Sequence, residues 1–97
     1  MPLGKFVKSP EEVKRYAVEY VDWLDTAEYL QSATITATPV TTNPLIFQLQ
    51  AFTANDTDLS FFVTGGVAGT TYKIVVHATT TNGQVKEDVI LLEVRSI

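Results

Sequence analysis

Polar and hydrophobic side chains alternate along most of the chain after residue 32, and this period of two is typical of β-strands with one buried face. Leu59, Phe61 and Val63, for example, form a row of apolar side chains at every second position. Residues 33–38 are rich in threonine and end at Pro39, which cannot donate a hydrogen bond to a neighbouring strand. The pattern predicts strands at Ala33–Thr38, at Leu45–Phe52, through Leu59–Val63, at Tyr72–Thr80 and at Gln84–Val94.

The alternation within residues 45–52 separates an apolar face from a mixed one. Phe47 and Ala51 fall on the same face, and Phe52 falls on the other. The polar residues 53–57 that follow predict a turn.

Residues 9–24 fit two kinds of element. Ser9 is a good N-cap, Pro10 suits the first helical position, and Glu12 follows the cap by three residues. The apolar side chains that recur at helical spacing are Val13, Tyr16, Ala17, Tyr20, Val21 and Leu24. The same stretch is rich in β-branched and aromatic residues, which favours a strand. Local rules favour the helix, and the strand remains the alternative.

Asn82 and Gly83 give the strongest local signal, because this pair tolerates the positive φ angles of a tight β-hairpin turn. A two-residue type I′ turn pairs positions whose numbers sum to 165 and sets His77 opposite Asp88. A three-residue loop with a bulge at Gly83 changes the sum to 164 and sets His77 opposite Glu87. The sequence leaves both registers open. In either one we expect the histidine to form a surface ion pair.

Both faces of this hairpin hold apolar side chains. Val75, Ile90 and Leu92 fall on a different face from at least part of the row that contains Tyr72 and Ile74. A two-layer sandwich needs only one apolar face on each sheet. We therefore expect the second face to be covered by this chain or by a partner, and Val75, Ile90 and Leu92 are candidate interface residues.

Three glycines in five positions, Gly65, Gly66 and Gly69, predict a loop that uses positive φ angles. The loop lacks the Gly-Lys-Ser/Thr sequence of a phosphate-binding loop. Tyr72 opens the next strand, and we expect its side chain to pack in the core with its hydroxyl bonded back to the loop backbone.

The chain has 97 residues, of which 45% are hydrophobic and 19% charged, so it is long enough for one domain. It contains no cysteine, which excludes disulfides, thiolate metal sites and cysteine nucleophiles. A domain this small without a disulfide depends on its packing or on partners, so a homo-oligomer is plausible. No apolar run long enough for a membrane span and no export signal are visible, which favours assembly in a cytoplasm.

The formal charge is −4, so we expect neither nucleic acid nor an anionic membrane as a partner. Four of the seven basic residues, Lys5, Lys8, Lys14 and Arg15, lie in the first fifteen positions. Residues 16–97 contain three basic and nine acidic side chains, which gives −6. We interpret residues 1–14 as a basic N-terminal arm, which is either a solvated terminus or a segment that reaches an acidic neighbour, and residues 15–97 as the single domain.

The sequence offers little for catalysis. His77 is the only histidine, and no serine, histidine and carboxylate occur at suggestive positions. The aspartates near Trp23 and in residues 55–58 do not match a calcium loop. We therefore predict no enzyme activity, metal or cofactor. Trp23 is expected to anchor the core or a sheet edge, with an interface contact as the alternative.

Several segments in order resemble one family of small virion proteins of tailed phages, described as fibre-tail adaptor or neck-associated proteins. The specific part is Gly65-Gly66-Val67-Ala68-Gly69-Thr70-Thr71-Tyr72, followed by the turn at 80–83. The other matching segments are Lys8-Ser9-Pro10-Glu11-Glu12-Val13, Tyr16 to Asp22-Trp23, and Leu30-Gln31-Ser32-Ala33-Thr34.

The resemblance implies an all-β fold, an immunoglobulin-like antiparallel β-sandwich of about seven strands. It replaces the helix by at most one helical turn at Ser9–Val13 and a first strand at Tyr16–Asp22. It implies a non-enzymatic oligomeric virion protein that binds neck, portal or connector, tail or fibre proteins. A capsid decoration protein and a carbohydrate-binding adhesion module, using exposed aromatics such as Phe62 or Tyr29, are the alternatives.

Overall fold

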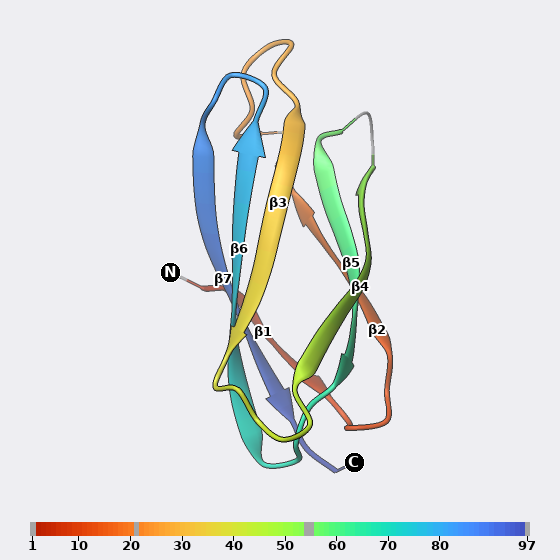
Figure 1. The fold of residues 1–97 in the computed structure, drawn as a ribbon. Helices are drawn as coiled ribbons and strands as arrows, with labels where there is room; N and C mark the ends of the chain where they lie inside the picture. The colour runs from red at the N-terminus through yellow and green to blue at the C-terminus, as the bar shows by residue number, and fades with distance from the viewer. Residues whose placement is uncertain (1, 21, 54–55, 97) are drawn as a thin grey trace.

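The computed structural model describes residues 2–20, 22–53 and 56–96, which form two β-sheets packed face to face (Figure 1). The strands are β1 (Pro2–Lys8), β2 (Lys14–Glu19), β3 (Leu30–Thr38), β4 (Leu45–Thr53), β5 (Asp58–Gly65), β6 (Thr70–Thr80) and β7 (Val85–Val94). One sheet has the order β1-β7-β6-β3 and the other the order β2-β5-β4. The described residues contain no helix. The expected all-β sandwich is confirmed.

The core lies between the sheets and is built from the inward rows of β5, β6 and β7. Leu59, Phe61 and Val63 are fully buried, as their alternation predicts. The facing row on the other sheet consists of Tyr72, Ile74, Val76, Ala78, Ile90, Leu92 and Val94. Each large apolar side chain buried in this way contributes about 1.5–3 kcal/mol, which is why β-strand patterning decides the fold.

The helix that local rules favour in residues 9–24 does not form, and the strand alternative is confirmed by β2, which begins two residues earlier than expected and ends at Glu19. Ser9 and Glu12 do make the contacts of a helix start, because the Ser9 amide donates to Glu12 Oε1 (2.8 Å) and the Glu12 amide to the Ser9 carbonyl (3.2 Å). These contacts close only a turn between β1 and β2. The strand then begins at Lys14, because pairing with β5 sets Tyr16 opposite Phe61 and buries Val18 in the core.

The N-terminal arm is not a separate segment. Pro2–Lys8 forms β1 and pairs in parallel with β7, with Lys5 opposite Leu91 and Lys8 opposite Val94. Strand pairing therefore joins the described part of residues 1–14 to the same sandwich as the rest of the chain. Met1 lies outside the described residues.

A register shift in β4 changes which aromatic side chain enters the core. Gln48 pairs with Phe62 but Ala51 pairs with Ser60, so one extra residue of β4 lies between them. Phe52 thereby packs against the core and Ala51 is exposed, the reverse of the simple alternation. The turn predicted at 53–57 includes residues 54 and 55, which lie outside the described residues.

The hairpin of β6 and β7 takes the longer loop. The Gly83 amide donates to the Thr80 carbonyl (3.0 Å), the Thr80 amide donates to the Gln84 carbonyl (2.9 Å), and Gly83 has a φ of 83°. Asn82 has no positive φ, so the type I′ alternative is wrong. His77 therefore lies opposite Glu87, and its Nε2 is 2.7 Å from Glu87 Oε2 in an exposed ion pair.

The glycine-rich loop and Tyr72 behave as predicted. Gly65, Gly66 and Gly69 all have positive φ angles. The Tyr72 side chain is fully buried, and its hydroxyl accepts a hydrogen bond from the Val67 amide (2.9 Å). The same hydroxyl lies 2.8 Å from Thr41 Oγ1, which ties the 39–44 loop to the loop before β6.

Candidate functional site

The three hairpin residues proposed for an interface lie on two different faces of the sheet. In the observed register Ile74 lies opposite Ile90, so β6 and β7 direct the same apolar row toward the core. Ile90 is 4% exposed and Leu92 is fully buried, so this chain itself covers both side chains, which was one of the two expected arrangements. Val75 points to the opposite face and is half-buried.

An apolar strip does exist on the outer face of the four-stranded sheet, with different members. Val75 lies opposite Val89, and the neighbouring row places Leu91 between Lys5 and Lys73. Val75, Val89 and Leu91 are all half-buried, whereas both lysines are exposed. This outer strip is small and bordered by cations.

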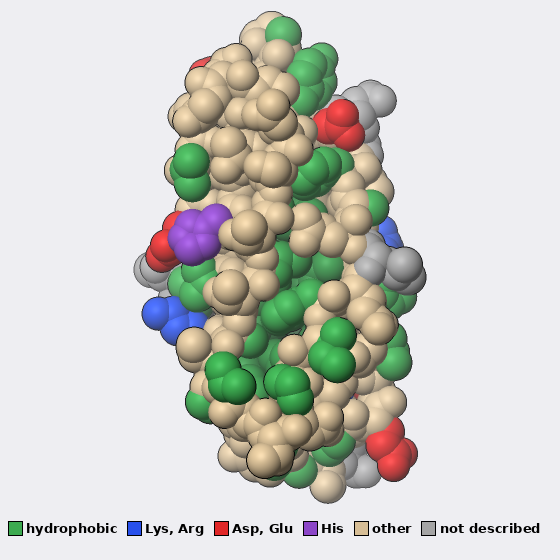
Figure 2. Space-filling view, viewed as in Figure 1, with side chains coloured by type: hydrophobic (Ala, Val, Ile, Leu, Met, Phe, Trp, Pro, Cys, Tyr) green, Lys and Arg blue, Asp and Glu red, His purple; other side chains and the backbone are tan. Residues whose placement is uncertain are grey.

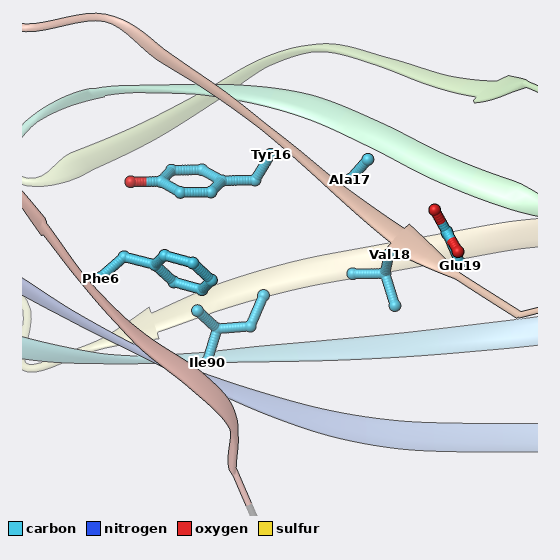
Figure 3. A pocket seen from close by; sticks show the side chains of 6 residues that line it. All are labelled: Phe6, Tyr16, Ala17, Val18, Glu19 and Ile90. Atoms are coloured by element: carbon cyan, nitrogen blue, oxygen red, sulfur yellow. The ribbon is translucent and has the colours of Figure 1, made fainter.

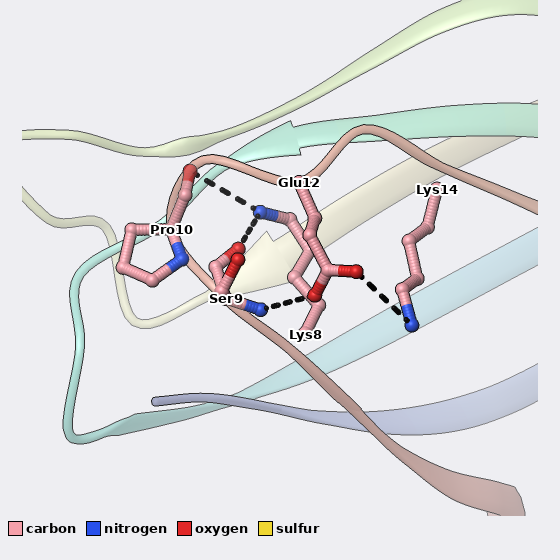
Figure 4. A network of polar contacts seen from close by, with 5 residues as sticks. All are labelled: Lys8, Ser9, Pro10, Glu12 and Lys14. Atoms are coloured by element: carbon pink, nitrogen blue, oxygen red, sulfur yellow. Dashed lines mark hydrogen bonds and ion pairs between the residues drawn. The ribbon is translucent and has the colours of Figure 1, made fainter. Parts of the chain in front are cut away.

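Lys8 is part of the framework rather than the surface. Its side chain is buried, and Nζ donates to the carbonyls of Ser9 (2.7 Å) and Pro10 (3.5 Å) (Figure 4). Nζ also donates to the Gly65 carbonyl (2.7 Å). Burial is the main cause that lowers the pKa of Lys8, with Glu12 acting in the opposite direction. The ammonium therefore fastens the β1–β2 turn to the end of β5 and is not available to a partner.

The other basic residues do not gather into one patch. Lys14 Nζ lies 3.6 Å from Glu12 Oε2, and this pair is partly exposed (Figure 4). The hydrogen bond from the Ser9 amide is the main cause that lowers the pKa of Glu12. Lys5 and Arg15 are exposed, but they belong to β1 and β2 in different sheets. Of the four basic residues in the first fifteen positions, only Lys5 and Arg15 make no ion pair or buried hydrogen bond with the described residues.

Trp23 packs at one end of the sandwich. Its ring lies 6.0 Å from the Tyr20 ring, and Lys86 Nζ lies 5.8 Å from its centroid. Lys86 also forms an ion pair of 3.2 Å with the buried Asp88. Burial first, and then the Asp88 carboxylate, raise the pKa of Tyr20. The half-buried tryptophan contacts the core, as expected of an anchor.

Glu28 is a buried carboxylate that the sequence reading overlooked. It accepts hydrogen bonds from the Asp25 amide (3.0 Å), from Gln84 Nε2 (3.0 Å) and from the Thr80 hydroxyl. The Thr80 hydroxyl is the main cause that lowers the pKa of Glu28. The spacing of Asp25 and Glu28, which is that of a capping box, was the available signal. The contacts connect residues 25–28 to the β6–β7 hairpin.

A pocket of about 310 Å³ opens between β1 and β2, the edge strands of the two sheets (Figure 3). Its lining residues are Phe6, Tyr16, Ala17, Val18, Glu19 and Ile90. Phe6 is 42% exposed, and its ring lies 5.2 Å from the Tyr16 ring. The Tyr16 hydroxyl is buried and finds no hydrogen-bond partner among the described residues. Burial is also the main cause that raises the pKa of Tyr16.

The pocket was missed because Phe6 was assigned to a free arm. Its members come from β1, β2 and β7, so no contiguous motif marks it. Within residues 2–20, 22–53 and 56–96, no three His, Cys, Asp or Glu side chains come together as a metal site. In the same ranges no helix has the length and apolar character of a membrane span. The described surface thus offers an apolar pocket, an outer strip and four edge strands.

Comparison with known proteins gives a family match over most of the chain. No curated protein matches the chain significantly. Residues 8–93, which run from the end of β1 to the end of β7, match the family described as podophage GP4 fiber-tail adaptor protein gp77. Because this match spans most of the 97 residues, the chain belongs to the Gp77 family of podophage GP4 fiber-tail adaptor proteins.

Proposed function

We propose that this protein is a non-enzymatic adaptor at the neck or tail of the phage particle, where it links the head-tail connector to fibres or neighbouring subunits. The family match over residues 8–93 carries this proposal, because the family is one of fibre-tail adaptors. We further propose that the sandwich is immunoglobulin-like. The strand orders β3-β6-β7 and β2-β5-β4 support this, since they follow the C-F-G and B-E-D orders of immunoglobulin domains.

An adaptor needs two separate binding surfaces, and the strand order supplies them. The edges β1 and β2 lie on one side of the sandwich, and β3 and β4 lie on the other (Figure 1). Partners at opposite edges do not compete for the same residues. This arrangement supports binding on both sides of one small domain.

The pocket between β1 and β2 is the proposed docking point for the first partner. A large apolar side chain of that partner would fit beside Phe6 and bury the exposed part of its ring. Buried anchors of this kind often contribute about 2 kcal/mol or more to binding. The Tyr16 ring, which lies 5.2 Å from the Phe6 ring, would form a second wall around the same side chain.

The exposed cations flank this side of the molecule. Lys5 lies on β1 and Arg15 on β2, and both are exposed. We propose that they attract an acidic partner, which makes the association rate sensitive to salt. The half-exposed Trp23 and Val75 are secondary candidates for contact.

The experiment is a binding measurement with purified tail, connector and fibre proteins of the same phage. We expect the wild-type chain to bind at least one of them, and Phe6→Glu to weaken that binding by about tenfold or more. Val85→Glu is the matched control, because Val85 is 63% exposed on β7 and does not line the pocket. A wild-type chain that binds none of these proteins would overturn the adaptor proposal. Equal losses in both variants would overturn the role of the pocket.

A further inference from the structure

The strand β3 is an edge strand without the usual protection. Natural proteins block such edges with charges, prolines or a covering segment. Residues 30–38 contain no charged residue and no proline, and Thr34, Thr36 and Thr38 are exposed. The edge strand β2, by contrast, carries Lys14, Arg15 and Glu19. The β3 edge is therefore open to pairing with another strand.

The inward side chains of β3 are incompletely covered. Ala33, Ile35 and Ala37 face the core, since they lie opposite Ala78, Val76 and Ile74 of β6. The three β6 residues are almost completely buried, but the three β3 residues are only half-buried. Phe47 and Phe52 of β4 are also half-buried. Figure 2 shows hydrophobic side chains along the line between β3 and β4, which we call the β3–β4 seam.

The backbone of β3 directs hydrogen-bonding groups out of this edge. Gln50 Nε2 of β4 donates to the Ala33 carbonyl (3.1 Å), so this carbonyl points away from β6. Bonding groups alternate in an antiparallel strand, so those of Ile35 and Ala37 point the same way. An added strand would bond to the outward amides and carbonyls of Ile35 and Ala37, and it would cover the β3–β4 seam.

We propose that β3 pairs antiparallel with β3 of a second copy of the chain, which joins the two four-stranded sheets into one sheet across the dimer. Such a contact is isologous and closes at two copies. The residues whose backbone groups point out of the edge, Ala33, Ile35 and Ala37, have odd numbers, so each must pair with an odd-numbered residue of the other copy. The numbers of two paired residues therefore have an even sum. The exposed threonines, which have even numbers, then lie opposite threonines of the other copy. Threonine pairs of this kind stabilise a sheet.

Charge favours a second copy as the occupant of this edge. Each chain has a formal charge of −4, so two copies repel wherever their charged surfaces meet. The strands β3 and β4 contain no ionisable side chain, so the contact between copies places no like charges together. A contact between copies at β1 or β2 would instead include charged residues of the edge strand, such as Lys5 on β1 and Arg15 on β2. The proposed dimer leaves the pocket between β1 and β2 free, and it does not depend on the adaptor function.

The first test is the molecular mass in solution by analytical ultracentrifugation over a range of concentrations. We expect a monomer–dimer equilibrium for the wild-type chain, and an increase of about tenfold or more in the dimer dissociation constant for Thr36→Lys. The matched control is Thr71→Lys, because Thr71 is exposed on the central strand β6. We expect it to change the constant less than about twofold. Urea unfolding of both variants checks that each is folded.

The second test uses the absence of cysteine in the natural chain. Single cysteines at Ser32, Thr34, Thr36 and Thr38 are oxidised alone and in pairwise mixtures. In an antiparallel pair of β3 strands, the residue numbers of opposite positions add to one fixed even value. We therefore expect disulfides only between cysteines whose residue numbers add to that value, and no disulfide for Thr71→Cys. A chain that stays monomeric at all concentrations, or cross-links without such a pattern, would overturn the proposal. So would a monomer whose β3 pairs only with a fibre or tail protein.

Discussion

The hydroxyl groups of Tyr72 and Tyr16 differ in their hydrogen bonding. The Tyr72 hydroxyl bonds to the Val67 amide and Thr41, whereas the Tyr16 hydroxyl has no partner among the described residues. We therefore expect Tyr72→Phe to lower the free energy of unfolding by about 1–3 kcal/mol, and Tyr16→Phe to leave it unchanged or raise it slightly. Urea unfolding followed by the fluorescence of Trp23, the only tryptophan, measures both. Equal destabilisation by the two variants would contradict this assignment.

The buried Glu28 makes the free energy of unfolding depend on pH. Its pKa is lowered in the folded state, mainly by the hydrogen bond from Thr80, so folding favours the carboxylate. This stabilisation is complete above the ordinary pKa of 4.5 and is lost as the pH falls through the lower folded value. We expect Glu28→Gln to be less stable than wild type at pH 7, with a difference that shrinks toward low pH.

The acid dependence of Glu28 is checked by urea unfolding at several pH values. Thr80→Val removes the main cause of the lowered pKa, so its acid dependence should also be weaker than that of wild type. A constant difference between wild type and Glu28→Gln at every pH would refute this role of the carboxylate.

At the level of single residues, the sequence predicted partners that lie close in the chain or within a strand. Tyr72 and the loop five residues before it were predicted correctly, because the bond is local. The pocket that brings Phe6 and Ile90 together was not predicted, because parallel pairing of β1 with β7 joins segments from both ends of the chain. A pattern within one stretch of sequence cannot predict the pairing of β1 with β7.

Two glycines at turns separate backbone strain from crowding. Gly83 has a φ of 83° and open space around it, so Gly83→Ala should cost only the backbone strain, about 1 kcal/mol. Gly66 has a φ of 100°, and a Cβ there would meet Val94 Cγ2 at 2.8 Å and Leu45 Cδ2 at 3.1 Å. We expect Gly66→Ala to cost about 2 kcal/mol or more. Urea midpoints and slopes of the two variants provide the measurement, and a smaller loss at Gly66 than at Gly83 would contradict it.

At the level of elements, strong alternation predicted β3 to β7 within a few residues. It did not predict β1, and it left helix and strand open for β2, because Ser9 and Glu12 have the spacing of a helix start although their contacts close only a turn. Pairing of β2 with β5 and burial of Val18 outweigh the local helix signal. Tertiary contacts also choose the three-residue hairpin loop, which the sequence left open.

For the whole molecule, the structure changes the meaning of the charge pattern. The sequence suggests a basic arm before a domain of charge −6, yet Lys8 is buried and Lys14 pairs with Glu12. Attraction between the arm of one copy and the body of the next therefore loses two of its four cations. The two open sides of the sandwich, at β1–β2 and at β3–β4, become the better basis for assembly.

The adaptor role is tested most directly by a density map of the phage particle in which the copies of this chain are located. We predict copies between the tail or connector and the fibres, each with the pocket beside Phe6 and Tyr16 filled by a side chain of another virion protein. Copies spread over the outer capsid, as for a decoration protein, or a particle without this chain, would contradict the proposed function.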